Sequence, residues 1–66
     1  MTELRPDTVT VYRDKSGHWR WRRVAPNGKT LADSGEGYVR KDDCVEIAKR
    51  VNVLATLVVD EPEEAL

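Results

Sequence analysis

Residues 8–24 read TVTVYRDKSGHWRWRRV, and the rest of the fold can be argued outward from them. Residues 8–13 are rich in β-branched and aromatic side chains, which favour a pleated strand. DKSG at residues 14–17 has the composition of a tight turn, because glycine adopts positive φ at little cost. Tryptophan and arginine alternate in residues 18–24, so a strand would send both indoles to one face and two guanidinium groups to the other. The segment predicts a β-hairpin with an apolar face and a cationic face.

A third strand and a helix are expected beyond the hairpin. APNG at residues 25–28 is a strong turn signal, and residues 29–34 follow as the third strand of an antiparallel meander. Two glycines in residues 34–38 favour a sharp change of direction. Apolar side chains then recur at three- and four-residue spacing, which predicts a helix from about Lys41 to about Leu54 across the apolar face of the sheet.

The fold class predicted is α+β, with a three-stranded antiparallel meander packed by one helix. Residues 56–60 are short and β-branched, and we interpret them as a fourth strand that completes a dimer rather than as a fraying helix end. The expected division is a flexible lead-in over residues 1–7, a single domain over residues 8–59 and an acidic, disordered tail over residues 60–66. The alternation alone leaves open which sheet face is buried.

A chain of 66 residues has room for only a thin core, since a domain of this size buries about 60% of the surface of its unfolded chain. Cys44 is its single cysteine and His18 its single histidine, so neither an intrachain disulfide nor a four-ligand zinc site is expected. We therefore expect no cofactor or metal. Self-association remains as the source of additional core.

Hydropathy argues against a membrane role. No apolar run approaches the roughly 20 residues that span a bilayer, and the first residues lack the apolar core of a secretion signal. A single thiol fits a reducing compartment. We expect a soluble, cytoplasmic protein.

The charges are unevenly placed, although the net charge is only -1. Five cations and one anion lie between Arg13 and Arg23, whereas residues 60–66 hold four anions and no cation. The near-neutral total therefore conceals a basic hairpin and an acidic tail.

The chain resembles the YegP-like family, a group of small domains of unknown function. The matching text is YRDK at residues 12–15, Gly17, WRWR at 19–22, NG at 27–28 and ADSGEGY at 32–38, with Lys41 and Cys44 beyond. The resemblance covers roughly residues 9–52. It implies a three-stranded antiparallel sheet packed by a helix, and a homodimer, because single copies in this family associate in imitation of tandem repeats. It implies no activity.

The chain departs from the family pattern at Arg40, where many relatives have a serine. Arginine cannot accept hydrogen bonds from the first N–H groups of a helix, as a serine cap does. Either Asp42 or Asp43 compensates, or the helix starts later.

Two sets of side chains are candidates for contacts. The candidate core or dimer-interface residues are Trp19, Trp21, Tyr38, Ile47, Val51, Leu57 and Val59. The indoles have a second interpretation, in which they stack on nucleobases or on a peptide. The candidate partner-binding residues are Arg13, His18, Arg20 and Arg22, with Arg13 expected across from the other three. They form either a phosphate-contacting patch, a solvated face, or half of a contact with the acidic tail.

Two other features favour structural roles. Cys44 falls on the apolar stripe of the helix and is expected to be buried rather than reactive. SGEG at residues 34–37 lacks the framework of a phosphate-binding loop and is expected to be a tight connection, held by hydrogen bonds of Asp33 and Glu36 and anchored by Tyr38.

These observations predict a non-enzymatic, homodimeric interaction module that binds another protein. The alternative is a nucleic-acid-binding module that uses the basic face of its sheet, by analogy with the arm-binding domains of phage integrases. An enzyme is not expected, because the chain supplies no visible pair of nucleophile and base.

Overall fold

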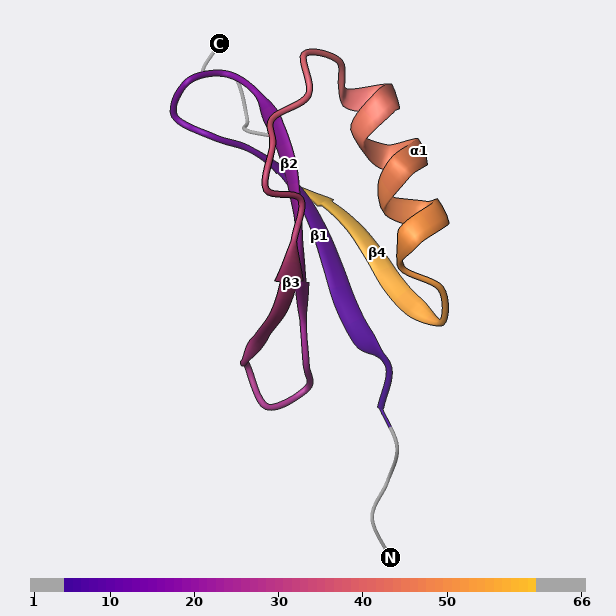
Figure 1. The fold of residues 1–66 in the computed structure, drawn as a ribbon. Coiled ribbons are helices and arrows are strands. Elements are labelled where there is room, and N and C mark those ends of the chain that lie inside the picture. The colour runs from indigo at the N-terminus through magenta and orange to yellow at the C-terminus, as the bar shows by residue number, and fades with distance from the viewer. Residues whose placement is uncertain (1–4, 61–66) are drawn as a thin grey trace, which may run out of the picture.

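One helix packs across a four-stranded sheet in residues 5–60, the part of the chain that the computed structural model describes (Figure 1). The sheet order is β3-β2-β1-β4. Neighbours pair antiparallel in β1/β2 and β2/β3 and parallel in β1/β4. The elements are β1 (Asp7–Arg13), β2 (Trp19–Val24), β3 (Thr30–Asp33), α1 (Lys41–Val51) and β4 (Ala55–Asp60).

The fourth strand corrects the predicted sheet. β4 exists close to the predicted residues 56–60, but it pairs in parallel with β1 of the same chain, from Asp7 opposite Ala55 to Tyr12 opposite Asp60. The sheet of one chain is therefore four-stranded and mixed, and not a three-stranded meander. Parallel neighbours need a long crossover connection, and α1 lies within the connection that returns the chain to β1.

The predicted element boundaries are close to those observed. Asp7 and Asp60, expected in the lead-in and the tail, lie at the ends of β1 and β4. Residues 1–4 and 61–66 of those two predicted segments lie outside the described part of the chain. The helix ends at Val51, earlier than predicted, because Asn52 has left helical geometry and Leu54 has a left-handed φ of 58°. These two residues reverse the chain into β4.

The helix begins at Lys41 without a side-chain cap. Arg40 stands at the N-cap position in extended conformation, and its side chain makes no capping hydrogen bond. Asp42 and Asp43 lie in the first turn, where their charges favour the positive end of the helix dipole. The helix therefore starts at the predicted residue, Lys41, although Arg40 provides no cap.

The buried face of the sheet is the tryptophan face. Val11 lies directly opposite Trp21 in the β1/β2 ladder, and both side chains are buried. Helix α1, which contacts β1 and β2, adds Cys44 and Ala48 to this core. The core is as thin as the chain length predicts: in residues 5–60 the buried apolar side chains are Val9, Val11, Trp21, Cys44 and Ala48.

Most of the other core candidates lie at the margin of this cluster. Trp19, Tyr38 and Leu57 are half-buried and pack against it. Val59 is 37% exposed and Val51 59% exposed, so neither is core within one chain. Ile47 is half-buried on α1.

The loop after β3 is held against β2 by its backbone and by Ser34. Trp19 and Tyr38 exchange two backbone hydrogen bonds, of 2.7 and 2.8 Å. The Ser34 hydroxyl donates to the carbonyl of Glu36 at 3.0 Å. Ser34, rather than the Asp33 or Glu36 carboxylates, thus provides the side-chain hydrogen bonds that the structure gives within this loop.

No helix in the described residues is long and apolar enough to cross a membrane.

Candidate binding surface

The face of the sheet opposite α1 is the candidate surface, and we call it the open face. Side chains alternate along a strand, so residues paired with one another across the ladders share a face. The registers Thr10 opposite Arg22 and Thr10 opposite Val58 place all three on the open face. The open face so defined carries Thr8, Thr10 and Tyr12 of β1, Arg20, Arg22 and Val24 of β2, Thr30 and Asp33 of β3, and Thr56, Val58 and Asp60 of β4.

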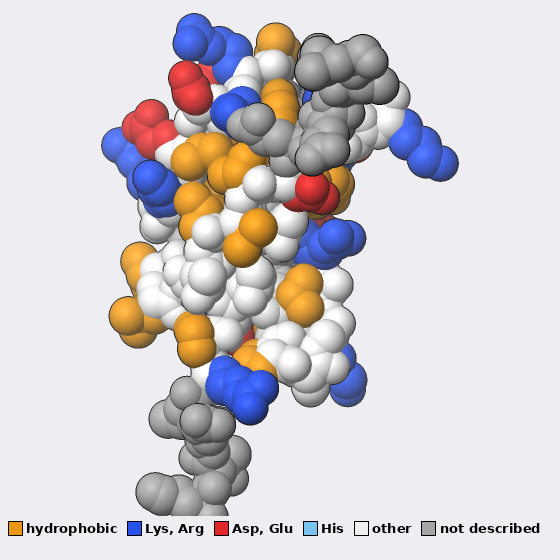
Figure 2. Space-filling view, turned by 180° about the vertical axis from the view of Figure 1, so that it is seen from behind, with side chains coloured by type: hydrophobic (Ala, Val, Ile, Leu, Met, Phe, Trp, Pro, Cys, Tyr) orange, Lys and Arg blue, Asp and Glu red, His pale blue; other side chains and the backbone are white. Residues whose placement is uncertain are grey.

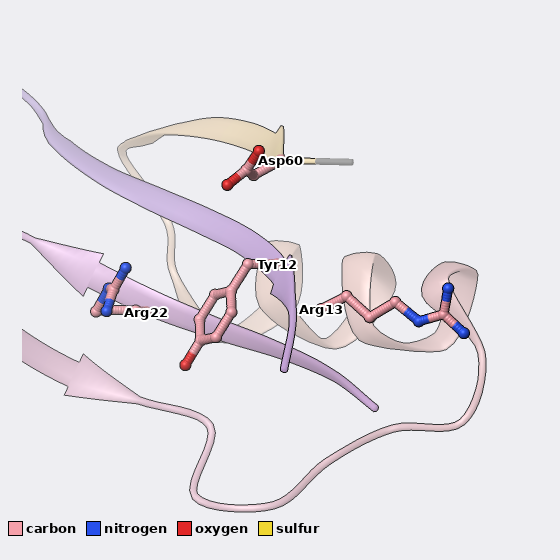
Figure 3. Close-up of a pocket in the computed structure, with 4 residues that line it drawn as sticks. All are labelled: Tyr12, Arg13, Arg22 and Asp60. Carbon is pink, nitrogen blue, oxygen red and sulfur yellow. The ribbon is translucent and has the colours of Figure 1, made fainter. Parts of the chain in front are cut away.

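Arg22 is held against an aromatic ring on this face. Its guanidinium carbon lies 5.0 Å from the ring centroid of Tyr12, a cation–π distance. Figure 3 shows the two side chains beside one another, with Tyr12 extending from β1 toward β2. The Tyr12 ring thus restricts the orientation of the Arg22 guanidinium.

Arg20 is paired with an acid. Its Nε donates to Oδ2 of Asp14 at 2.6 Å. This contact raises the pKa of Arg20 and compensates its charge. The predicted cationic face therefore carries less net positive charge than its arginines alone suggest, and the register adds Asp33 and Asp60 to it.

Asp14 organises the turn between β1 and β2, a role that the sequence analysis did not assign. Its Oδ1 accepts hydrogen bonds from the Ser16 hydroxyl at 2.7 Å, the Ser16 N–H at 2.9 Å and the His18 N–H at 3.0 Å. The Ser16 hydroxyl, then Arg20 and the His18 N–H, hold the pKa of this carboxyl well below its ordinary value. An aspartate two residues before a serine in a turn is the local signal for such a motif.

The placement of Arg13 corrects the sequence prediction. Arg13 lies opposite Trp19, so it shares the face of α1 and not that of Arg20 and Arg22. Its guanidinium lies 5.9 Å from the Trp19 ring, and its Nε donates to the Gly17 carbonyl at 3.2 Å. In Figure 3 it extends away from Tyr12. The register makes Tyr12 the residue opposite Arg20, and strand alternation then turns Arg13 to the other side.

His18 is exposed and precedes β2. Its Nδ1 lies 2.8 Å from the hydroxyl of Ser16, so it belongs to the turn. Of the four candidate partner-binding residues, the structure brings Arg20 and Arg22 together on the open face.

Arg23, a cation of the basic hairpin, links three parts of the fold on the other face. Its Nε donates to Oδ2 of Asp7 at 2.8 Å. Its Nη1 lies 3.5 Å from Oδ1 of Asn52 and 3.4 Å from the carbonyl of Val53. Arg23 therefore joins β1 and β2 to the turn between α1 and β4.

A shallow pocket opens at one end of the sheet. Its lining residues are Tyr12, Arg13, Arg22 and Asp60, from β1, β2 and β4 (Figure 3). The pocket is polar, with two guanidinium groups and one carboxylate. Among residues 5–60 there is no group of three or more histidine, cysteine or acidic side chains arranged to hold a metal ion.

Neither the Cys44 thiol nor the Tyr38 hydroxyl is activated by deprotonation. Burial raises the pKa of Cys44, so its thiol stays protonated and weakly nucleophilic. Burial also raises the pKa of Tyr38, with a smaller contribution from Glu36.

The fold and surface define a small α+β domain with one covered and one open sheet face. The family model described as "Domain of unknown function (DUF1508)" matches residues 14–58, and the chain belongs to that family. The YegP-like resemblance is thereby confirmed, because the YegP-like domains are this same UPF0339/DUF1508 family.

Two curated relatives come from Neisseria meningitidis: UPF0339 protein NMB1088 of serogroup B and UPF0339 protein NMA1193/NMA1859 of serogroup A. Each is 44% identical to this chain over 34 residues, which is 52% of this chain and 59% of the relative. The match thus spans less than two thirds of these relatives. The comparison with solved structures found no match.

Proposed function

We propose that this domain is a non-enzymatic interaction module that forms a homodimer through the outer edge of β4 and offers its open face to another protein. The observation that carries the proposal is the position of β4. It is the outermost strand of the sheet on the side of β1, and its valines reach the surface: Val58 is 43% exposed and Val59 37%.

The two sheet edges differ in their capacity to pair. An edge strand presents a row of N–H and C=O groups that another strand can extend. β3 has only four residues, and its pairing with β2 shifts register at Arg23/Val24, which is a common protection against further pairing. β4 has six residues and no register shift against β1. β4 is therefore the edge better suited to a second copy.

Side-chain chemistry selects a register for the dimer. Directly opposite residues of an antiparallel pair point to the same face, so a two-fold axis normal to the sheet must lie between the two β4 strands, level with a residue that faces its own copy. An axis at Val58 places Leu57 opposite Val59 and Thr56 opposite Asp60, which matches polarity on both faces. An axis at Leu57 would instead place Thr56 opposite Val58.

Apolar surface near β4 supports the same assignment. Val51, Val53 and Leu54, at the end of α1 and in the turn before β4, are 59%, 65% and 91% exposed. Seen from behind, apolar side chains lie at the surface in several groups among charged ones (Figure 2). A second copy at β4 would extend a core that one chain leaves thin.

The test is sedimentation equilibrium on the wild type and two matched variants. Val58→Lys places a charge at the proposed axis, and we expect the dimer dissociation constant to rise at least roughly tenfold. Val39→Lys is the control, because Val39 is 81% exposed and precedes α1, away from β4. A wild type that sediments as a folded monomer at micromolar concentration, or a Val58→Lys variant that still dimerises like the control, would refute the proposal.

Nucleic-acid binding is the second candidate function. The Arg22 guanidinium on the Tyr12 ring, beside Arg20, is the observation that favours it. The pairing of Arg20 with Asp14 and the presence of Asp60 on the same face weaken it.

A further inference from the structure

The two inner strands of the sheet carry an aromatic–cationic pair on the open face, and the two outer strands carry carboxylates. In the order β3-β2-β1-β4, Arg22 and Tyr12 belong to β2 and β1, whereas Asp33 and Asp60 belong to β3 and β4. The registers place Asp33 directly opposite Arg22 and Asp60 directly opposite Tyr12. The tyrosine–arginine pair therefore has a carboxylate on each side.

The two arginines of the open face are unequally compensated. Arg20 has Asp14 as its ion-pair partner at 2.6 Å. Arg22 is exposed and lies on the Tyr12 ring rather than on Asp33 (Figure 3). Within residues 5–60 the structure gives the Arg22 side chain no hydrogen bond and no ion pair. Arg22 thus keeps its five N–H donors for an acceptor that a partner supplies.

We propose that the open face recognises a protein segment in which one acidic side chain lies between basic ones. The acidic side chain binds the Arg22 guanidinium, which can donate two parallel N–H bonds to a carboxylate. The basic side chains meet Asp33 and Asp60 on the outer strands. This assignment names the partner of the open face, so it rests on that part of the proposed function, but it does not rest on the dimer.

The layout of the face is typical of a protein interface. Residues that dominate binding are enriched in tyrosine and arginine and lie near the centre, whereas charged side chains lie at the rim. Tyr12 and Arg22 stand on the inner strands, and Val58, 43% exposed, adds apolar surface nearby on β4. Because the Tyr12 ring already restricts the guanidinium, binding costs less side-chain freedom.

The outer carboxylates select against a polyanion. A nucleic-acid strand carries a negative charge on every phosphate, so a phosphate bound at Arg22 brings further negative charges toward Asp33 and Asp60. Like charges that face each other across an interface oppose binding. A segment of mixed charge matches the sequence of negative, positive and negative groups across the strands.

The test begins with selection of a phage-displayed library of random peptides on the full wild-type chain. We expect the enriched peptides to share an acidic residue with basic residues near it. Their affinity should fall by at least about tenfold in Arg22→Gln, because the charge-assisted contact is lost. Arg50→Gln is the matched control, since it removes an exposed arginine of α1, and it should leave the affinity unchanged.

Two further comparisons test the positioning by Tyr12 and the role of the carboxylates. Tyr12→Phe keeps the ring and should preserve peptide binding, whereas Tyr12→Leu removes the ring and should weaken binding by about threefold. The double variant Asp33→Asn and Asp60→Asn should bind the peptides less tightly than the wild type and a single-stranded oligonucleotide more tightly. Shifts in opposite directions distinguish charge complementarity from a general loss of structure.

A selection that enriches no peptide, enriched peptides without an acidic residue, or equal binding by wild type and Arg22→Gln would overturn the assignment. Tighter binding of the oligonucleotide than of the peptides by the wild type at about 0.15 M salt would also overturn it, in favour of nucleic acid.

Thr30→Lys, an exposed position of the open face on β3, separates this inference from the proposed function. Peptides that lose affinity through Thr30→Lys but not through Arg22→Gln would overturn the role of Arg22 and leave the open face as the binding surface. Peptides insensitive to both variants would count against both proposals. Sedimentation of the same samples reports the dimer separately.

Discussion

Gly37 and His18 approach so closely that a β-carbon on Gly37 would lie 2.6 Å from the His18 Cβ. The approach follows from the backbone bridge between Tyr38 and Trp19, the residues that come next in each segment. This bridge extends the pairing of β2 at its start and fixes the path by which the chain leaves β3 for α1. Glycine at this position is therefore a packing requirement.

Replacing Gly37 by alanine should destabilise the domain by about 1–3 kcal/mol, because an overpacked backbone contact must move apart. Urea denaturation measures the loss. Adding His18→Gly should recover part of it by removing the opposing Cβ, whereas adding His18→Ala should not. A Gly37→Ala variant as stable as the wild type would show that the loop does not lie against β2 in this way.

Asp14 should make stability depend on pH in the acid range. Its folded-state pKa is lowered, so its contribution is fully present above the ordinary aspartate value of about 3.9 and is lost as the pH falls below it. Asp14→Asn should reduce stability at neutral pH and flatten this decline. Thermal denaturation from pH 2 to 7 tests this, with Asp33→Asn, an exposed aspartate of β3, as the control. Parallel pH profiles for wild type and Asp14→Asn would contradict it.

Cys44 should be inert in the native state. Its thiol is buried and its pKa is raised by that burial, so little thiolate is present at neutral pH. We expect slow reaction with a thiol-specific reagent in buffer and complete, rapid reaction in denaturant. Rapid native reaction at the rate of a free thiol would assign Cys44 to an accessible site instead.

Arg23 should matter to folding and Arg22 should not. Arg23→Met removes the contacts to Asp7, Asn52 and Val53, and we expect a loss of about 1–3 kcal/mol. Arg22→Met is the matched change one residue away, on the open face, and should cost less than about 1 kcal/mol. Equal losses in denaturation experiments would contradict the division of the hairpin arginines between two faces.

Oligonucleotides should bind weakly, because Asp14 pairs with Arg20 and because Asp33 and Asp60 share the open face with the arginines. We expect weak association at low salt that disappears near physiological ionic strength. A fluorescence titration with single- and double-stranded probes tests this, alongside the double variant Arg20→Ala and Arg22→Ala. Binding that persists at about 0.15 M salt and is lost in the double variant would favour the nucleic-acid function.

Local residue types were sufficient to predict most of the elements. The strands of the β1–β2 hairpin lie within one residue of their predicted bounds, because β-branched runs and glycine turns act over a few residues. The periodic stripe through Cys44 and Ala48 likewise located α1 and its buried side. The end of the helix was predicted less well, since the turn at Leu54 is imposed by the return of the chain to the sheet.

The residues of the candidate site could be predicted only in part, because their grouping depends on how the strands pair. Alternation within one strand correctly grouped Arg20 with Arg22, but the prediction for Arg13 was wrong because it needed the register across the turn. No sequence pattern within residues 55–60 predicts that this strand pairs with β1, or that the pairing is parallel.

The sequence by itself thus determined the type and order of the elements, which depend on interactions between near neighbours in the chain. The tertiary structure alone decided the register of Tyr12 with Arg20 and the parallel contact of β4 with β1. The hairpin register depends on the length and conformation of the turn that Asp14 organises, and the β1/β4 contact depends on which distant segments bury the same apolar face together.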